Sequence, residues 1–104
     1  MPTEQYHEPP DELSEKTRTF ARMITGMIEE ADAINWYTQR ISVEKDKGAR
    51  AIMRNARNEE MKHFGMDLEF LMRADDDLRK TLKAILFKKG DIVEHGEEAE
   101  DAVD

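Results

Sequence analysis

The chain has 104 residues, enough for one small folded unit and too few for two separate hydrophobic cores. Hydrophobic and charged residues each make up 38% of it, and the apolar positions are mostly Leu, Ile, Met and Ala, which favour an all-α fold. The formal net charge of -8 argues against a surface for nucleic acid or anionic membranes. With no cysteine, the chain has no thiolate ligands, so any metal must bind to oxygen and nitrogen.

The first segment, residues 1–11, lacks periodicity and contains Pro9-Pro10, so we expect a flexible arm. It also lacks the basic and apolar regions of a signal peptide, and no apolar run in the chain reaches the roughly 20 residues of a membrane span. We therefore expect a cytoplasmic protein. Residues 12–43 contain no proline, which predicts one long helix.

A short polar connection over residues 42–48 predicts that the chain turns back into a second long helix over residues 49–73, giving an antiparallel hairpin. The acidic stretch after it offers N-caps for a short third helix near residues 78–87. We expect the helical domain to span residues 12–90. Residues 91–104 are acidic and poor in apolar side chains, so we expect a disordered tail there.

The first predicted helix has one carboxylate in its apolar stripe. Glu30 shares a face, at steps of three and four residues, with Met23, Met27, Ile34, Tyr37 and Ile41. A carboxylate removed from water is costly unless it is paired or binds a metal. The alternative is an edge residue whose carboxylate reaches solvent.

The second predicted helix repeats this feature. Glu60 and His63 share a face with Ile52, Ala56 and Phe70, and their spacing of three lets both side chains approach one ion. The pattern alone is weak, because Glu4 and His7 have the same spacing in the arm. A lone inward histidine is also often a structural core residue.

Together, Glu30, Glu60 and His63 match half of the ligand set of ferritin-like di-iron bundles, in which two helices each give one Glu and two give Glu-x-x-His. Two copies related by a twofold axis would form a four-helix bundle with the complete set. We therefore predict a homodimer with a shared di-iron (Fe) centre, and a larger assembly. Carboxylates and imidazole suit iron, and zinc would also bind.

A second stripe on the first helix carries Glu29, Asp32 and Trp36. We interpret it either as a cation-attracting vestibule, with Tyr37 donating a hydrogen bond to a ligand carboxylate, or as a solvated acidic face.

Several stretches resemble encapsulated ferritins, the short two-helix relatives of ferritin found inside encapsulin shells. The matching stretches are His7-Glu8-Pro9, Ile28-Glu29-Glu30-Ala31, Asn35-Trp36-Tyr37-Thr38-Gln39-Arg40, Asn58-Glu59-Glu60-Met61-Lys62-His63, Met66-Asp67-Leu68-Glu69-Phe70-Leu71 and Leu86-Phe87.

The resemblance implies that Glu30, Glu60 and His63 are ferroxidase ligands with Tyr37 beside them. It also implies that Glu29, Asp32 and Trp36 form a secondary metal site. By the same likeness, dimers form a ring inside an encapsulin nanocompartment, and the shell holds the iron mineral. Two other functions remain open: a non-catalytic helical assembly module, and a protein that binds divalent metal without redox turnover.

Overall fold

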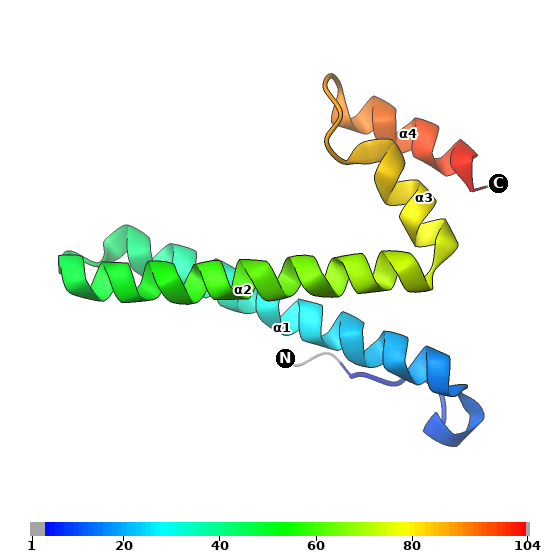
Figure 1. The fold of residues 1–104 in the computed structure, drawn as a ribbon, viewed down its shortest axis with the longest axis horizontal. Helices are drawn as coiled ribbons and strands as arrows, with labels where there is room; N and C mark the ends of the chain where they lie inside the picture. Colours follow the sequence, from blue (N-terminus) through cyan, green and yellow to red (C-terminus); the bar gives the residue numbers. More distant parts are fainter. Residues whose placement is uncertain (1–3, 104) are drawn as a thin grey trace. The chain divides into compact units, whose positions relative to one another are not determined.

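A computed structural model describes residues 4–103, and in that range every long element is a helix (Figure 1). The elements are a 3-10 turn at Pro10–Glu12 followed by α1 (Glu15–Val43), α2 (Lys47–Ala74), α3 (Asp76–Ile85) and α4 (Ile92–Ala102). The all-α prediction of two long helices and a short C-terminal helix is confirmed. The chain divides into two compact units, one ending at Leu68 and the other beginning at Glu69.

Helix α1 begins at Glu15, three residues later than predicted, because Ser14 caps it. The Ser14 hydroxyl accepts a hydrogen bond from the backbone N–H of Thr17 at 3.1 Å. We predicted a flexible arm over residues 1–11. In the structure the end of this arm enters the 3-10 turn, and Arg18 Nη1 donates a hydrogen bond to the carbonyl oxygen of Pro10 at 3.3 Å. Residues 1–3 of the arm lie outside the described residues.

A three-residue connection joins α1 to α2 and reverses the chain (Figure 1). Asp46 acts as the cap of α2, because its Oδ2 accepts from the backbone N–H of Ala49 at 2.8 Å. The Glu44 carboxylate accepts from the next two backbone N–H groups, each at 3.0 Å, and so holds the turn. The expected connection over residues 42–48 is thus shorter in the structure, and α2 begins at Lys47.

Helix α3 starts at the acidic stretch that we predicted to cap it. Asp75 Oδ1 accepts from the backbone N–H of Leu78 at 3.0 Å, and Asp76 forms ion pairs with Arg79 and Lys80. The helix therefore begins at Asp76, two residues earlier than expected. It ends at Ile85, near Phe87, whose φ of 62° lies in the left-handed region that bulky residues rarely adopt.

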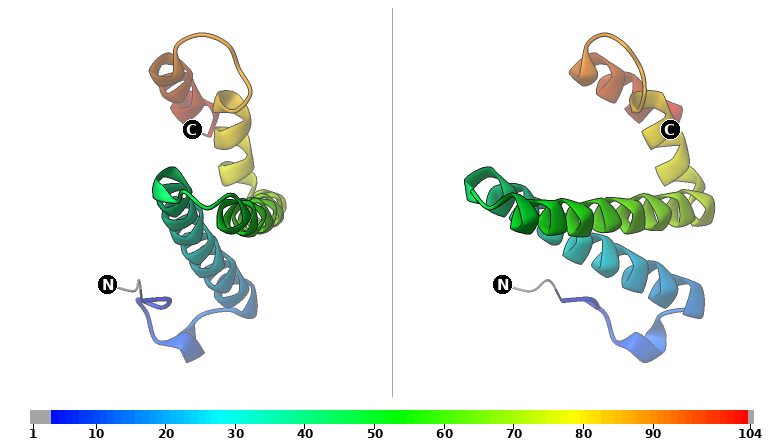
Figure 2. Two further views of the ribbon diagram at one scale, coloured as in Figure 1. Left: turned by 90° about the vertical axis from the view of Figure 1, so that its left-hand side faces the viewer. Right: turned by 60° about the vertical axis from the view of Figure 1, so that its left-hand side comes forward.

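The prediction of a disordered tail over residues 91–104 differs from the structure, in which Ile92–Ala102 form α4. Asp91 supplies the reason, since its Oδ1 accepts from the backbone N–H groups of Val93 and Glu94 and so caps the helix. Ala99 is almost fully buried, and α4 lies beside α3 in both views of Figure 2. The small side chain of Ala99 lets α4 pack although the segment has few apolar residues. Residue 104 lies outside the described residues.

Burial is scarce in this single chain. Within residues 4–103, only Ile41, Leu71 and Ala99 are buried, and large apolar side chains such as Ile52 and Met66 are 73% and 61% exposed. Across that part of the chain, none of the helices has the length and apolarity needed to cross a bilayer.

Candidate metal centre

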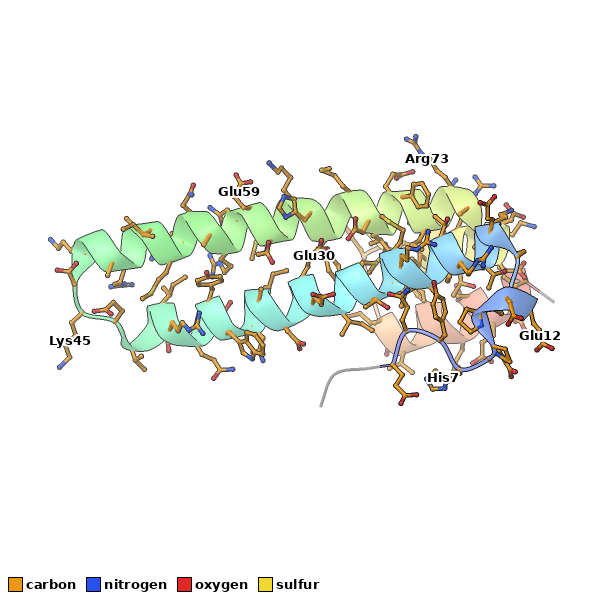
Figure 3. The ribbon with its side chains drawn as sticks, turned by 90° about the horizontal axis from the view of Figure 1, so that it is seen from below. His7, Glu12, Glu30, Lys45, Glu59 and Arg73 are labelled. Carbon is orange, nitrogen blue, oxygen red and sulfur yellow. The ribbon has the colours of Figure 1, made fainter. Side chains whose placement is uncertain are left out.

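Glu30 lies between α1 and α2 (Figure 3). Its Oε2 is shielded from solvent and, within the described part of the chain, receives no hydrogen bond. A buried carboxylate oxygen without a donor is costly, and a bound cation removes that cost. The sequence prediction of an inward carboxylate at this position therefore agrees with where the structure places the Glu30 side chain.

The surroundings of Glu30 raise its pKa from 4.5 to about 7. Burial is the largest cause, because it disfavours the charged form. Next comes the Asp67 carboxylate, which accepts a hydrogen bond from the protonated Glu30 carboxyl and repels the ionised one. Glu60 adds repulsion, and His63 opposes these effects. Two carboxyl groups of α2 thus act on Glu30 of α1 across the hairpin.

Glu60 and His63 contact each other on α2, as their spacing predicted. His63 Nδ1 lies 3.2 Å from Glu60 Oε1, and the side chains are 44% and 27% exposed, respectively. A hydrogen bond from Nδ1–H to the carboxylate fixes the ring tautomer and leaves Nε2 as the free lone pair, the arrangement common for metal-binding histidines.

Asp67 was missed as a site residue in the sequence analysis, which noted it only within a family motif. It follows His63 by four residues and Glu60 by seven, so helical spacing alone could have placed it on their face. Its Oδ2 lies 3.5 Å from the point that a Cβ on Gly26 would occupy. A Cβ at position 26 would therefore make an ordinary van der Waals contact with this oxygen, and the Asp67 carboxylate lies close to α1 at Gly26.

Tyr37 and Trp36 line an open hollow of about 530 Å³ next to Glu60. Its other lining residues are Ala33, Arg40, Ala56 and Glu59. Arg40 lies over the Tyr37 ring at 5.3 Å, a cation–π contact. Within the described part of this one chain Tyr37 makes no hydrogen bond to a carboxylate, so that proposed role stays a prediction.

The residues of the expected secondary site are only partly brought together. Glu29 and Asp32 are exposed and, among the described residues, take part in no ion pair or hydrogen bond, whereas Trp36 faces the hollow at 52% exposure. Glu59 projects from α2 and pairs with Lys62 at 2.9 Å, which lowers its pKa (Figure 3). A secondary site stays a prediction.

The chemistry of these donors suits a hard divalent cation, since all are carboxylate oxygens or imidazole nitrogens. Within residues 4–103 of one chain, no three acidic or histidine side chains converge closely enough to hold an ion. The chain offers two pairs instead, Glu30 with Asp67 and Glu60 with His63.

Comparisons with known proteins identify the family. Residues 5–89 match the EncFtn-like family model. The chain is 41% identical over 95 residues to a ferritin-like protein of Thermotoga maritima, covering 91% of this chain and 83% of that protein. It is 38% identical over 86 residues to an encapsulated ferritin-like protein of Rhodospirillum rubrum, and this match covers 83% of the chain but 61% of the relative.

A solved structure has the same fold. The crystal structure of protein ne0167 from Nitrosomonas europaea superimposes with a TM-score of 0.80 at 41% identity, over 84% of this chain and 96% of that one. The resemblance drawn from the sequence motifs is confirmed by these matches. The chain is therefore a member of the EncFtn-like family.

Proposed function

We propose that this protein oxidises Fe(II) to Fe(III) at a di-iron centre shared by two copies of the chain. The names of its relatives, a ferritin-like and an encapsulated ferritin-like protein, support a role in iron handling. The observation that carries the proposal is the buried, donorless Oε2 of Glu30, surrounded by the carboxylates of Asp67 and Glu60. A cation is the partner that this environment lacks.

The exposed face of the hairpin supports a second copy as the missing half. Ile52, Glu59 and Met66 follow one another at intervals of seven residues, so they share a face of α2. Glu59 also lines the hollow beside Glu60, so this face adjoins the candidate centre. Contiguous exposed apolar patches usually mark an interface, and α2 also exposes Met61 and Phe70. A symmetric pair would cover them and bring Glu30, Glu60 and His63 to their symmetry mates.

In such a pair, the residues would act in distinct ways. Fe(II) is the substrate, and each ion gives up one electron, for which dioxygen is the proposed acceptor. Glu30 and Glu60 supply hard, negative oxygens that favour the higher charge of the ferric product. His63 offers Nε2, because its Nδ1 is directed at Glu60. Tyr37 and Trp36 would wall the centre on the side of the hollow.

The decisive experiment adds Fe(II) without oxygen and then admits air, while ferric absorbance is followed. We expect a rapid rise in the unmodified protein and a loss of at least tenfold in rate for Glu60→Ala and His63→Ala. Matched controls are Glu69→Ala and His7→Ala, which remove the same groups from exposed positions and should keep the rate.

A rate no faster than buffer would reject the ferroxidase. In that case, zinc binding lost in Glu60→Ala would indicate a divalent-metal protein without turnover. If no metal binds, the inward acids would serve pairing alone, as expected of a helical assembly module.

The Rhodospirillum rubrum relative also supports a location. It is described as encapsulated, and we infer that this chain assembles as a ring of dimers inside an encapsulin shell that stores the oxidised iron. Co-expression with an encapsulin shell protein tests this: the chain should co-purify with intact shells. Recovery only outside the shells would contradict the location without affecting the oxidation chemistry.

A further inference from the structure

Asp67 is an acidic residue of the candidate centre that the sequence analysis did not predict as a ligand. Asp67 Oδ2 lies 3.5 Å from the point that a Cβ on Gly26 would occupy, so its carboxylate lies close to α1 one helical turn before Glu30, and it raises the pKa of Glu30. Within residues 4–103 it forms no ion pair with a Lys or Arg. The groups that face Glu30 are therefore Asp67 and Glu60, with His63 as the one base among them.

We propose that Asp67 is a specificity-determining residue of the shared iron centre, a carboxylate that selects and tightens the binding of divalent cations by making the metal-free centre electrostatically unfavourable. This inference rests on the proposed function, since it concerns the same centre. It adds one negative charge per chain beyond Glu30 and Glu60, and thus two in the symmetric pair.

The physical reason is the balance of charge before and after binding. Without metal, neighbouring ionised carboxylates repel one another in a partly buried environment, where the effective dielectric constant is well below that of water. A bound divalent cation cancels this repulsion. The loss of the repulsion therefore contributes to the free energy of cation binding. A monovalent cation cancels less of it. Asp67 therefore favours divalent over monovalent ions even if it never touches the metal.

The Gly26 contact shows how the chain maintains this arrangement. An Ala at position 26 would place its Cβ at ordinary van der Waals distance from Asp67 Oδ2, so there is room for one methyl group and little more. The half-buried Asp67 carboxylate of α2 therefore lies close to α1 at Gly26, one helical turn before Glu30. That placement is what makes its charge act on Glu30.

The test compares Asp67→Asn with the full-length protein, using Co(II) as the probe in isothermal titration calorimetry and thermal unfolding in excess chelator at pH 8. Asn keeps the shape and removes the charge, and its amide can donate to the Glu30 carboxylate. We expect Co(II) affinity to fall about tenfold while the metal-free unfolding temperature rises. Asp67→Glu, which restores the charge, should recover affinity.

Two controls separate charge from packing. Asp77→Asn removes the same charge from an exposed position on α3, and Gly26→Ala adds a methyl group beside Asp67 without changing charge; both should keep Co(II) affinity. Unchanged affinity in Asp67→Asn would overturn the proposal. So would a parallel loss of affinity and metal-free stability, which is the result expected of a purely structural residue.

The experiments distinguish a failure of this inference from a failure of the proposed function. If the unmodified protein fails to oxidise iron but Asp67→Asn still weakens Co(II) binding and stabilises the metal-free form, the function is wrong and the inference stands. If iron is oxidised and the two Asp67 effects are absent, the inference alone is wrong.

Discussion

The acidic residues of the α1–α2 hairpin and those of the α3–α4 region do opposite things. In the second region Asp75 and Asp91 stand at helix starts, where backbone N–H groups bind their carboxylates. In the hairpin, Glu30, Glu60 and Asp67 lie within helices, and the latter two raise the pKa of Glu30. The same chemical group stabilises the fold at a helix start and carries an electrostatic cost between the helices of the hairpin.

The largest expected effect comes from disrupting the pairing of the hairpin with a second copy of the chain. Met66→Glu places a charge on the exposed apolar face, and it does so twice in a symmetric dimer. We expect loss of association equivalent to about 3–6 kcal/mol, from two methionine side chains at about 1.5–3 kcal/mol each. Sedimentation equilibrium measures it. Ile92→Glu, at an exposed apolar position of α4, is the matched control and should keep the dimer.

Metal binding should stabilise the hairpin next. With Co(II) at about one hundred times its dissociation constant, linkage predicts a gain of about 2.7 kcal/mol in the free energy of unfolding, and chelation should abolish it. The measurement is chemical denaturation with and without Co(II). Glu60→Gln should lose the gain. If Glu60→Gln keeps it in full, Co(II) binds elsewhere on the chain.

The pH dependence of metal-free stability should follow Glu30. Because its pKa in the folded chain is raised from 4.5 to about 7, the folded state holds this proton more tightly than the unfolded state. The contribution of Glu30 to the free energy of unfolding is fully present below pH 4.5 and is lost as the pH rises through about 7. Thermal unfolding in chelator should show this decline, and Glu30→Gln should flatten it. Glu29→Gln, the exposed neighbour, should leave the decline intact.

The smallest expected effect lies in the α3–α4 region. Asp91→Ala removes the cap of α4 and should cost about 1 kcal/mol, because two backbone N–H groups lose their acceptor. Amide hydrogen exchange should show faster opening of α4 while Co(II) affinity stays unchanged. A loss of Co(II) affinity in this variant would mean that the α3–α4 region and the hairpin are coupled and do not act separately.

The sequence by itself determined the two long helices, the turn between them and the face that carries Glu30, Glu60 and His63. Helical spacing and the position of prolines depend on local backbone chemistry, so they can be read from the order of residues. The caps at Asp46 and Asp75 moved helix ends by only two residues, for the same local reason.

The tertiary structure decided what depends on contacts between distant residues. Asp67 raises the pKa of Glu30, thirty-seven positions earlier in the chain, and lies close to α1 at Gly26. The α4 helix exists although its composition predicted disorder, because Asp91 caps it and Ala99 is buried. Both outcomes rest on burial and on through-space charge, quantities that a linear pattern of residue types does not contain.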